Sequence, residues 1–155
     1  MNKKIMFVLC TIFILCIGSM ANAATSFKDI KNKQCEDSVN TLISLGIVNG
    51  YPEDNTYRPE NTVTRAEMAK LMVVALGKDG KVAEATKNNS KFRDVKSSDW
   101  EVGYVNVASE LGIINGYPDG SFRPFENMTR AQCCVMLHRL MEKGKNWWED
   151  LFQYF

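Results

Sequence analysis

Residues 45–52 read Leu-Gly-Ile-Val-Asn-Gly-Tyr-Pro, and residues 111–118 read Leu-Gly-Ile-Ile-Asn-Gly-Tyr-Pro. Seven of these eight positions are identical at an offset of 66 residues. Further matched blocks lie on both sides at an offset of 65: residues 27–30 with 92–95, 58–59 with 123–124, and 64–66 with 129–131. Matched blocks in the same order indicate an internal duplication, so we expect the chain to consist of two similar structural units.

Each repeat has the pattern of a helix, a loop and a second helix. The first helix ends at a glycine, Gly46 or Gly112, and the second begins at a threonine, Thr64 or Thr129. We expect the first helices to bury Val39, Leu42, Ile43 and Leu45, or Tyr104, Val105, Ala108 and Leu111. We expect the second helices to bury Met68, Ala69, Leu71, Met72 and Ala75, or Cys133, Cys134, Met136, Leu137 and Leu140. The fold class is therefore mainly α, with repeats at 27–76 and 92–141 and a polar linker at 77–91.

The N-terminus has the layout of a secretory signal peptide. Lys3 and Lys4 precede an uncharged run at 5–17, and Ala-Asn-Ala at 21–23 is a typical cleavage site. We expect residues 1–23 to form a signal helix that is removed, because the run is short for a retained membrane anchor. Cleavage as a lipoprotein at Cys16 is disfavoured by the bulky Leu15 before it.

Composition favours a binding protein over an enzyme. Without Lys3 and Lys4, 17 of the 19 basic residues remain against 18 acidic residues, so nothing attracts nucleic acid. The single histidine, His138, has no visible catalytic partner, and no metal-ligand spacing or phosphate-binding glycine loop is present in the sequence. We expect no cofactor and no metal. The cysteines outside the signal peptide are Cys35, Cys133 and Cys134, which suit small core residues, although a bridge from Cys35 stays open.

Thr64-Arg65-Ala66-Glu67 is a capping box, and Thr129-Arg130-Ala131-Gln132 qualifies as a second one. The box explains the threonine and the Glu or Gln, but not the arginine, which stands at the positive end of the helix dipole. An anion would account for it, because free N–H groups and a guanidinium can converge on one carboxylate or phosphate. The alternative is a salt bridge to Asp29 or Asp94.

These blocks together resemble the S-layer homology domain: Phe-x-Asp-Val, a helix led by Trp100, Gly-Ile-Ile-x-Gly-Tyr-Pro-Asp-Gly-x-Phe-Arg-Pro, and Thr-Arg-Ala-Glu. Members of that family anchor surface proteins to secondary cell-wall polysaccharides bound to peptidoglycan, which are often pyruvylated. The resemblance implies a non-catalytic anchor at the bacterial cell wall or S-layer. It also implies a set of ligand-binding residues: Arg65, Arg130, Thr64, Thr129, Glu67, Gln132, Trp100, Tyr51 and Tyr117.

Three features depart from the family pattern. Gln132 replaces the motif glutamate, and the first repeat has Gln34 or Cys35 where the second has Trp100. The family usually has three repeats in a three-lobed prism, whereas two are visible here. We therefore expect an incomplete prism, and either weak anchoring or a bundle completed by another chain. The second case is the alternative function: an assembly protein that pairs with itself or with another protein of the family.

The C-terminal residues 144–155 read as a short amphipathic helix. Its aromatic and apolar side chains recur at helical spacing on one face: Trp147, Trp148, Leu151, Phe152 and Phe155. We expect this tail to cover the core where a third repeat would lie. An apolar patch for self-association is the second interpretation, and binding to a membrane surface is the third.

Overall fold

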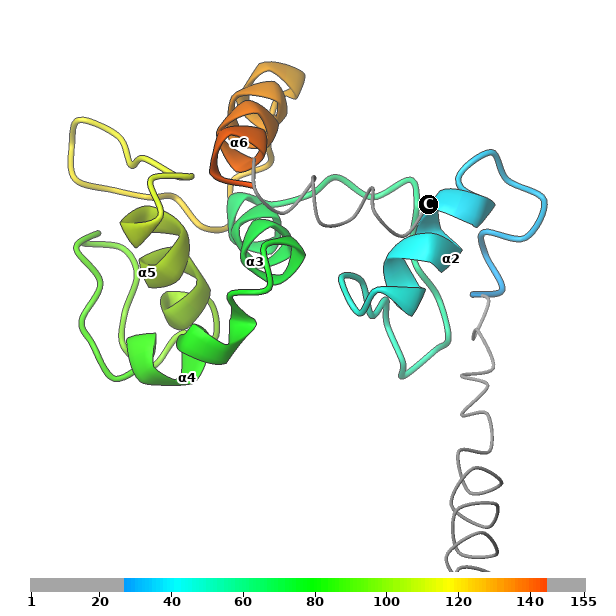
Figure 1. The fold of residues 1–155 in the computed structure, drawn as a ribbon, viewed down its shortest axis with the longest axis horizontal. Coiled ribbons are helices and arrows are strands. Elements are labelled where there is room, and N and C mark those ends of the chain that lie inside the picture. Colours follow the sequence, from blue (N-terminus) through cyan, green and yellow to red (C-terminus); the bar gives the residue numbers. More distant parts are fainter. Residues whose placement is uncertain (1–26, 145–155) are drawn as a thin grey trace, which may run out of the picture.

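The computed structural model describes residues 27–144, and this part of the chain is mainly helical, as expected (Figure 1). Within it there are two isolated β-bridges and no named strand. The helices are α2 (Glu36–Ser44), α3 (Arg65–Ala75), the 3-10 turn η1 (Asp79–Lys81), α4 (Val82–Ala85), α5 (Val102–Glu110) and α6 (Arg130–Lys143). The predicted signal helix and aromatic tail lie outside the described residues.

The predicted helix signals are confirmed at both ends. Thr64 and Thr129 each accept a hydrogen bond from the backbone N–H three residues on, and the Glu67 or Gln132 side chain accepts from the threonine N–H. Both capping boxes are therefore complete. Gly46 and Gly112 follow α2 and α5 with φ of 70° and 71°, a conformation that glycine adopts without strain.

The Phe-x-Asp motif ties each loop to the start of its repeat. The Asp29 carboxylate accepts hydrogen bonds from the Tyr57 and Arg58 N–H groups at 2.9 and 2.7 Å. Asp94 accepts in the same way from Phe122 and Arg123 at 2.8 and 2.7 Å. Burial alone would raise the pKa of Asp29, but the two backbone N–H groups lower it. This motif thus holds the loop in shape, and it forms no salt bridge with Arg65 or Arg130.

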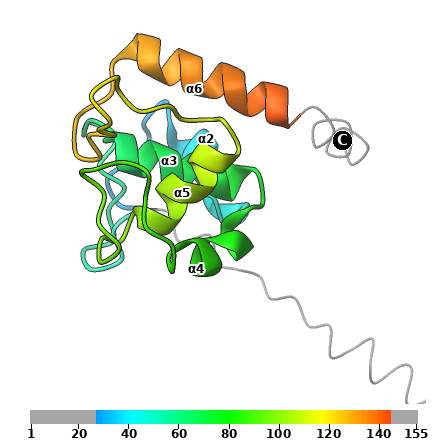
Figure 2. The same cartoon turned by 90° about the vertical axis from the view of Figure 1, so that its left-hand side faces the viewer.

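Packing does not follow the repeat boundaries. Helix α3 belongs to the first repeat by sequence, yet it packs on α5 of the second, and α4 packs on α5 as well. Together with α6 they form the C-terminal body (residues 62–144), which is turned toward the viewer in Figure 2. Its core contains Ala69, Met72, Val73, Ala85, Phe92, Val95, Val102, Val105, Val107, Ala108, Ile113, Ile114, Phe122 and Met136.

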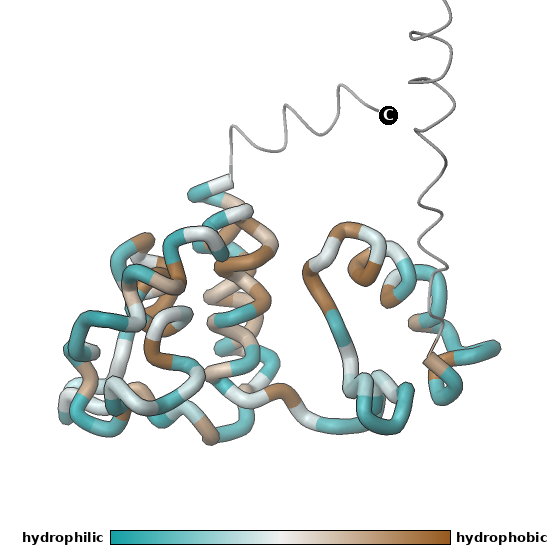
Figure 3. The backbone as a smooth tube through the Cα atoms, turned by 90° about the horizontal axis from the view of Figure 1, so that it is seen from below, coloured by the Kyte–Doolittle hydropathy of each residue, from teal (hydrophilic) through white to brown (hydrophobic). Residues whose placement is uncertain are grey.

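Helix α2 and its loop form a separate N-terminal lobe (residues 27–61). The lobe has its own small core of Phe27, Ile30 and Val39, with Cys35, Ile43 and Tyr57 packed against it. An extended segment joins the lobe to the body (Figures 1 and 3). Among residues 27–144, α2 makes no extensive contact with another helix.

This arrangement changes which predicted core positions are buried. On α3, Ala69 and Met72 are buried as predicted, together with Val73. On α6 only Met136 is buried, so the prediction for Cys134 and Leu137 is wrong, and both are exposed. Leu45, the residue after α2, was also predicted to be buried but is 55% exposed. The reason is the same in each case: no element of residues 27–144 packs against that face.

The predicted linker is more ordered than its composition suggested. Residues 77–91 include η1 and α4, and Ala85 is buried against the body. In addition, the Asn106 side chain of α5 donates to the Ala85 and Asn88 carbonyl oxygens. None of the helices in the described part of the chain is long and apolar enough to cross a membrane.

Candidate binding grooves

A groove of about 440 Å³ lies between the N-terminal lobe and helix α3; we call it groove 1. Its polar and aromatic lining residues are Asn49, Tyr51, Tyr57, Arg58, Asn61, Thr62, Glu67, Lys70 and Trp100. Three of the residues expected from sequence therefore meet here: Tyr51, Glu67 and Trp100. Aromatic rings beside charged and amide side chains can stack on a ring-shaped polar ligand and orient it by hydrogen bonds.

Trp100 reaches groove 1 from the second repeat. Its side chain is 52% exposed, and its ring lies 6.4 Å from that of Tyr104. The remaining polar and aromatic lining residues belong to the loop and the second helix of the first repeat. The second repeat thus supplies the tryptophan that the first repeat lacks, and one tryptophan serves this groove.

Arg65 lies at the junction of the repeats and is only 7% exposed. Its Nε donates to the Phe122 carbonyl oxygen at 2.7 Å, and one Nη donates to that of Asn115 at 3.4 Å. Its guanidinium carbon lies 4.7 Å from the Phe122 ring centroid and 5.0 Å from that of Tyr117. The first repeat therefore inserts a cation into the loop of the second.

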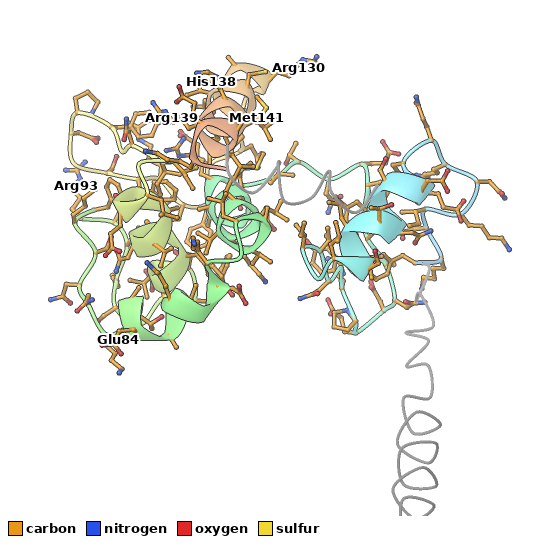
Figure 4. All side chains as sticks on the ribbon, viewed as in Figure 1. Glu84, Arg93, Arg130, His138, Arg139 and Met141 are labelled. Carbon is orange, nitrogen blue, oxygen red and sulfur yellow. The ribbon has the colours of Figure 1, made fainter. Side chains whose placement is uncertain are left out.

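The first turn of α3 is closed by backbone contacts. The N–H groups of Arg65 and Ala66 donate to the carbonyl oxygens of Glu126 and Pro124 at 3.0 and 2.9 Å. The expected free N–H groups are therefore not available on α3. On α6, by contrast, the N–H groups of Arg130 and Ala131 have no hydrogen-bond partner among residues 27–144, and Arg130 points away from the body (Figure 4).

A second groove of about 220 Å³, groove 2, lies between the second loop and α6. It is lined by Arg65, Ile114, Asn115, Ala131, Gln132, Val135, Met136 and Arg139. The lining contains two guanidinium groups, two carboxamides and no carboxylate. Arg139 donates to the Ile113 carbonyl oxygen at 3.3 Å, which directs its side chain toward this loop. The groove has the donor set that binds a carboxylate or phosphate.

Tyr51 and Tyr117 each lie under an arginine of their own loop. Arg58 stands 3.7 Å from the Tyr51 ring centroid, and Arg123 stands 3.9 Å from that of Tyr117. Gln132 donates to the Tyr117 hydroxyl, which in turn donates to Glu126. These bonds connect the capping residue of α6 to the loop that lines groove 2.

In each loop an aspartate forms a salt bridge with the arginine that lies over the tyrosine: Asp54 with Arg58, and Asp119 with Arg123. Asp119 accepts from the Ser121 hydroxyl at 2.6 Å and from its N–H at 2.9 Å, and it faces Arg93 and Arg123. The hydrogen bonds from Ser121, followed by the two guanidinium groups, lower the pKa of Asp119 to about 2. Hydrogen bonds from Thr56 and then Arg58 lower the pKa of Asp54 in the first loop.

Sequence reasoning missed Arg139 and Lys70. The repeat gave no signal for Arg139, because Val74 is the residue 65 positions earlier. Lys70 read as an ordinary exposed helix residue, yet its Nζ lies 5.8 Å from the Tyr104 ring centroid and it lines groove 1. Only the tertiary structure shows that these two side chains face a groove, Lys70 beside the second repeat and Arg139 beside the loop of its own repeat.

The remaining reactive side chains form no further site in the described residues. His138 is exposed and pairs with Glu142 at 3.6 Å, whereas Cys35, Cys133 and Cys134 are free thiols. Within residues 27–144 no group of three or more His, Cys, Asp or Glu side chains could hold a metal ion.

Comparisons with known proteins agree with this organisation. The model of the S-layer homology domain matches residues 26–69 and 91–133. The chain is 37% identical over 145 residues to a middle cell wall protein of Brevibacillus brevis and 36% identical over 143 residues to a surface layer protein of Brevibacillus choshinensis. Each match covers 91% of this chain but only 14% and 13% of those proteins.

A third relative is a cellulosome-anchoring protein of Acetivibrio thermocellus, 31% identical over 79% of this chain and 27% of that protein. The chain thus spans a small part of the length of these relatives. The two matched repeats and the identities to cell-wall and surface-layer proteins show that the chain belongs to the S-layer homology domain family, a family of the bacterial cell wall and surface.

Proposed function

We propose that the chain is a non-catalytic anchor that binds an anionic cell-wall polysaccharide in grooves 1 and 2. The observation that carries the proposal is groove 1, where Trp100, Tyr51 and Tyr57 lie beside Asn49, Asn61, Glu67 and Lys70. A sugar ring has an apolar face that can stack on an aromatic side chain, and hydroxyl groups at its edge that can bond to amides and charges.

Groove 2 supplies the affinity for negative charge. Arg65 and Arg139 line it together with the carboxamides of Asn115 and Gln132, and one Nη of Arg65 has no hydrogen bond to residues 27–144. A carboxylate there would be bound by charge-assisted hydrogen bonds, which are about twice as strong as neutral ones. The pyruvate ketal expected from the family is one such carboxylate.

Gln132 fits this role better than the glutamate that it replaces. It keeps the capping box of α6, and it lines groove 2 without adding a negative charge. In this proposal the departure from the family motif favours an anionic ligand. Arg130 lines neither groove, so this proposal assigns it no ligand contact, although the first turn of α6 has two N–H groups without a partner among residues 27–144.

The test is co-sedimentation of residues 24–155 with purified cell-wall sacculi, before and after chemical removal of the secondary polysaccharide. We expect binding that is lost on stripping. Trp100→Ala and Arg139→Ala should each weaken binding roughly 10-fold or more, the loss expected for one stacking or charged contact.

Arg93→Ala is the matched control, because Arg93 is an exposed arginine that pairs with Asp119 and lines neither groove. Equal binding to stripped and intact sacculi would refute the proposal, as would equal losses in Arg93→Ala and Arg139→Ala.

A further inference from the structure

Helix α6 exposes the face that its repeat partner α3 buries. All five buried residues of α3 have exposed counterparts 65 positions later. The pairs are Arg65 with Arg130, Ala66 with Ala131, Ala69 with Cys134, Met72 with Leu137, and Val73 with His138. Arg130 and His138 can be seen on the outside of α6 in Figure 4. In α3 the same face packs on the first half of the following repeat.

The N-terminal lobe has a hollow where the second repeat holds α3. This hollow, of about 710 Å³, is lined by Lys33, Gln34, Cys35, Ser38, Val39, Leu42, Tyr57, Pro59 and Glu60. Three of these residues correspond to residues of the second repeat that contact α3 directly. The counterpart of Ser38 is Tyr104, whose ring lies under Lys70. The counterpart of Tyr57 is Phe122, whose carbonyl oxygen accepts from the Arg65 side chain. The counterpart of Pro59 is Pro124, whose carbonyl oxygen accepts from the Ala66 N–H group.

The backbone groups are complementary in the same way. Within the chain, the Arg65 and Ala66 N–H groups donate to Glu126 and Pro124. The counterparts of these donors are the N–H groups of Arg130 and Ala131, which donate to no acceptor among residues 27–144. The counterparts of the acceptors are the carbonyl oxygens of Asn61 and Pro59, and these too receive no hydrogen bond from residues 27–144.

We propose that α6 of one copy of this chain docks into the N-terminal hollow of a second copy. Arg130 then lies against Tyr51 and Tyr57 of that copy, as Arg65 lies against Tyr117 and Phe122 within the chain. The occupant is a second copy because every chain carries both the projecting helix and the hollow. The contact between α3 and the second repeat within one chain is the model for this contact between two chains. The proposal does not depend on polysaccharide binding.

Within one chain, α6 packs on the C-terminal body and not in the hollow of the N-terminal lobe. It is fastened to the body through the Arg139 bond to Ile113 and through buried Met136, and it leaves the opposite face open. On this open face, Leu137 is 44% exposed and Met141 is 50% exposed. Each contact joins the α6 helix of one copy to the hollow of another. Two copies can satisfy both contacts reciprocally, which makes a closed isologous dimer, whereas contacts made in one direction only would extend into a chain of copies.

Self-association of residues 24–155 is the first measurement, by light scattering and sedimentation from about 1 to about 500 μM in reducing buffer, so that the thiols cannot crosslink. We expect reversible association. Cys134→Glu combined with Leu137→Glu alters the helix face, and Leu42→Glu alters the hollow; each should weaken association at least 100-fold. Cys134→Ser is the control for the helix face, because it keeps a small residue on α6. Ser44→Glu is the control for Leu42→Glu, because it places the same charge on the exposed side of α2.

Mixing the two variants separates loss of contact from misfolding. The hollow of the α6 variant and the α6 of the hollow variant are both intact, so the mixture should associate although neither variant does so alone. A monomeric wild-type chain at every concentration would overturn the proposal. A truncated chain of residues 24–144 that associates where the full chain does not would overturn it as well, and would assign the tail as the cover.

Discussion

Arg65, in the first repeat, donates its Nε to the carbonyl oxygen of Phe122, in the second repeat, over 2.7 Å. The bond fastens the N-terminus of α3 to the loop that lines groove 2. Because Arg65 is buried and bonds two carbonyl oxygens, it supports the fold in addition to any ligand contact. Arg130 holds the same place in the sequence of its own repeat but is exposed.

Arg65→Ala should therefore lower the free energy of unfolding by roughly 2 to 3 kcal/mol, because it leaves polar groups without partners. Arg130→Ala should change it by less than about 0.5 kcal/mol. Urea denaturation of both variants at low protein concentration checks the contrast. Equal effects of the two substitutions would mean that the inter-repeat contact contributes nothing to stability.

Gln132→Glu should keep α6 capped, although it removes the hydrogen bond that Gln132 donates to the Tyr117 hydroxyl, and it should weaken ligand binding. Glutamate completes the capping box in α3, so the helix tolerates it, but it would place a carboxylate in groove 2 beside Arg65 and Arg139. We expect affinity for a carboxylated wall saccharide to fall about 10-fold, or about 1.4 kcal/mol. Titration calorimetry is the measurement, and Asn88→Asp, an equal charge change at an exposed linker position, is the control.

Acid should weaken the second loop through Asp119. Its pKa is lowered from 3.8 to about 2, so its stabilising contribution is present above about pH 4 and is lost as the pH falls toward 2. The melting temperature of Asp119→Asn should therefore fall less than that of the wild type across this range. Asp79→Asn, in the exposed turn after α3, should keep the wild-type profile. Parallel profiles for all three chains would rule out this role of Asp119.

Glu101 should destabilise the body at neutral pH. It is fully buried at the start of α5, and neither carboxylate oxygen has a hydrogen-bond partner among residues 27–144. Burial, with a smaller effect from Asp99, raises its pKa, so its ionisation costs stability as the pH rises above about 4.5. Glu101→Gln should melt at a higher temperature than the wild type at pH 7, and the difference should shrink toward pH 4.5. A variant that melts below the wild type at pH 7 would contradict this account.

The sequence alone determined the features that depend on local geometry. The repeat offset, the glycines that end α2 and α5, and both capping boxes follow from short-range conformational preferences, which act over a few neighbouring residues. The resemblance to the family depended on the same matched motifs.

The tertiary structure decided which helix packs on which. Burial depends on the partner across the interface, and α3 finds its partner in the next repeat, so identical motifs bury Arg65 and expose Arg130. The same packing brings Trp100 of the second repeat into groove 1 and Arg65 of the first repeat into groove 2. No pattern within one repeat encodes these meetings, because they arise only when the second half of one repeat packs on the first half of the next.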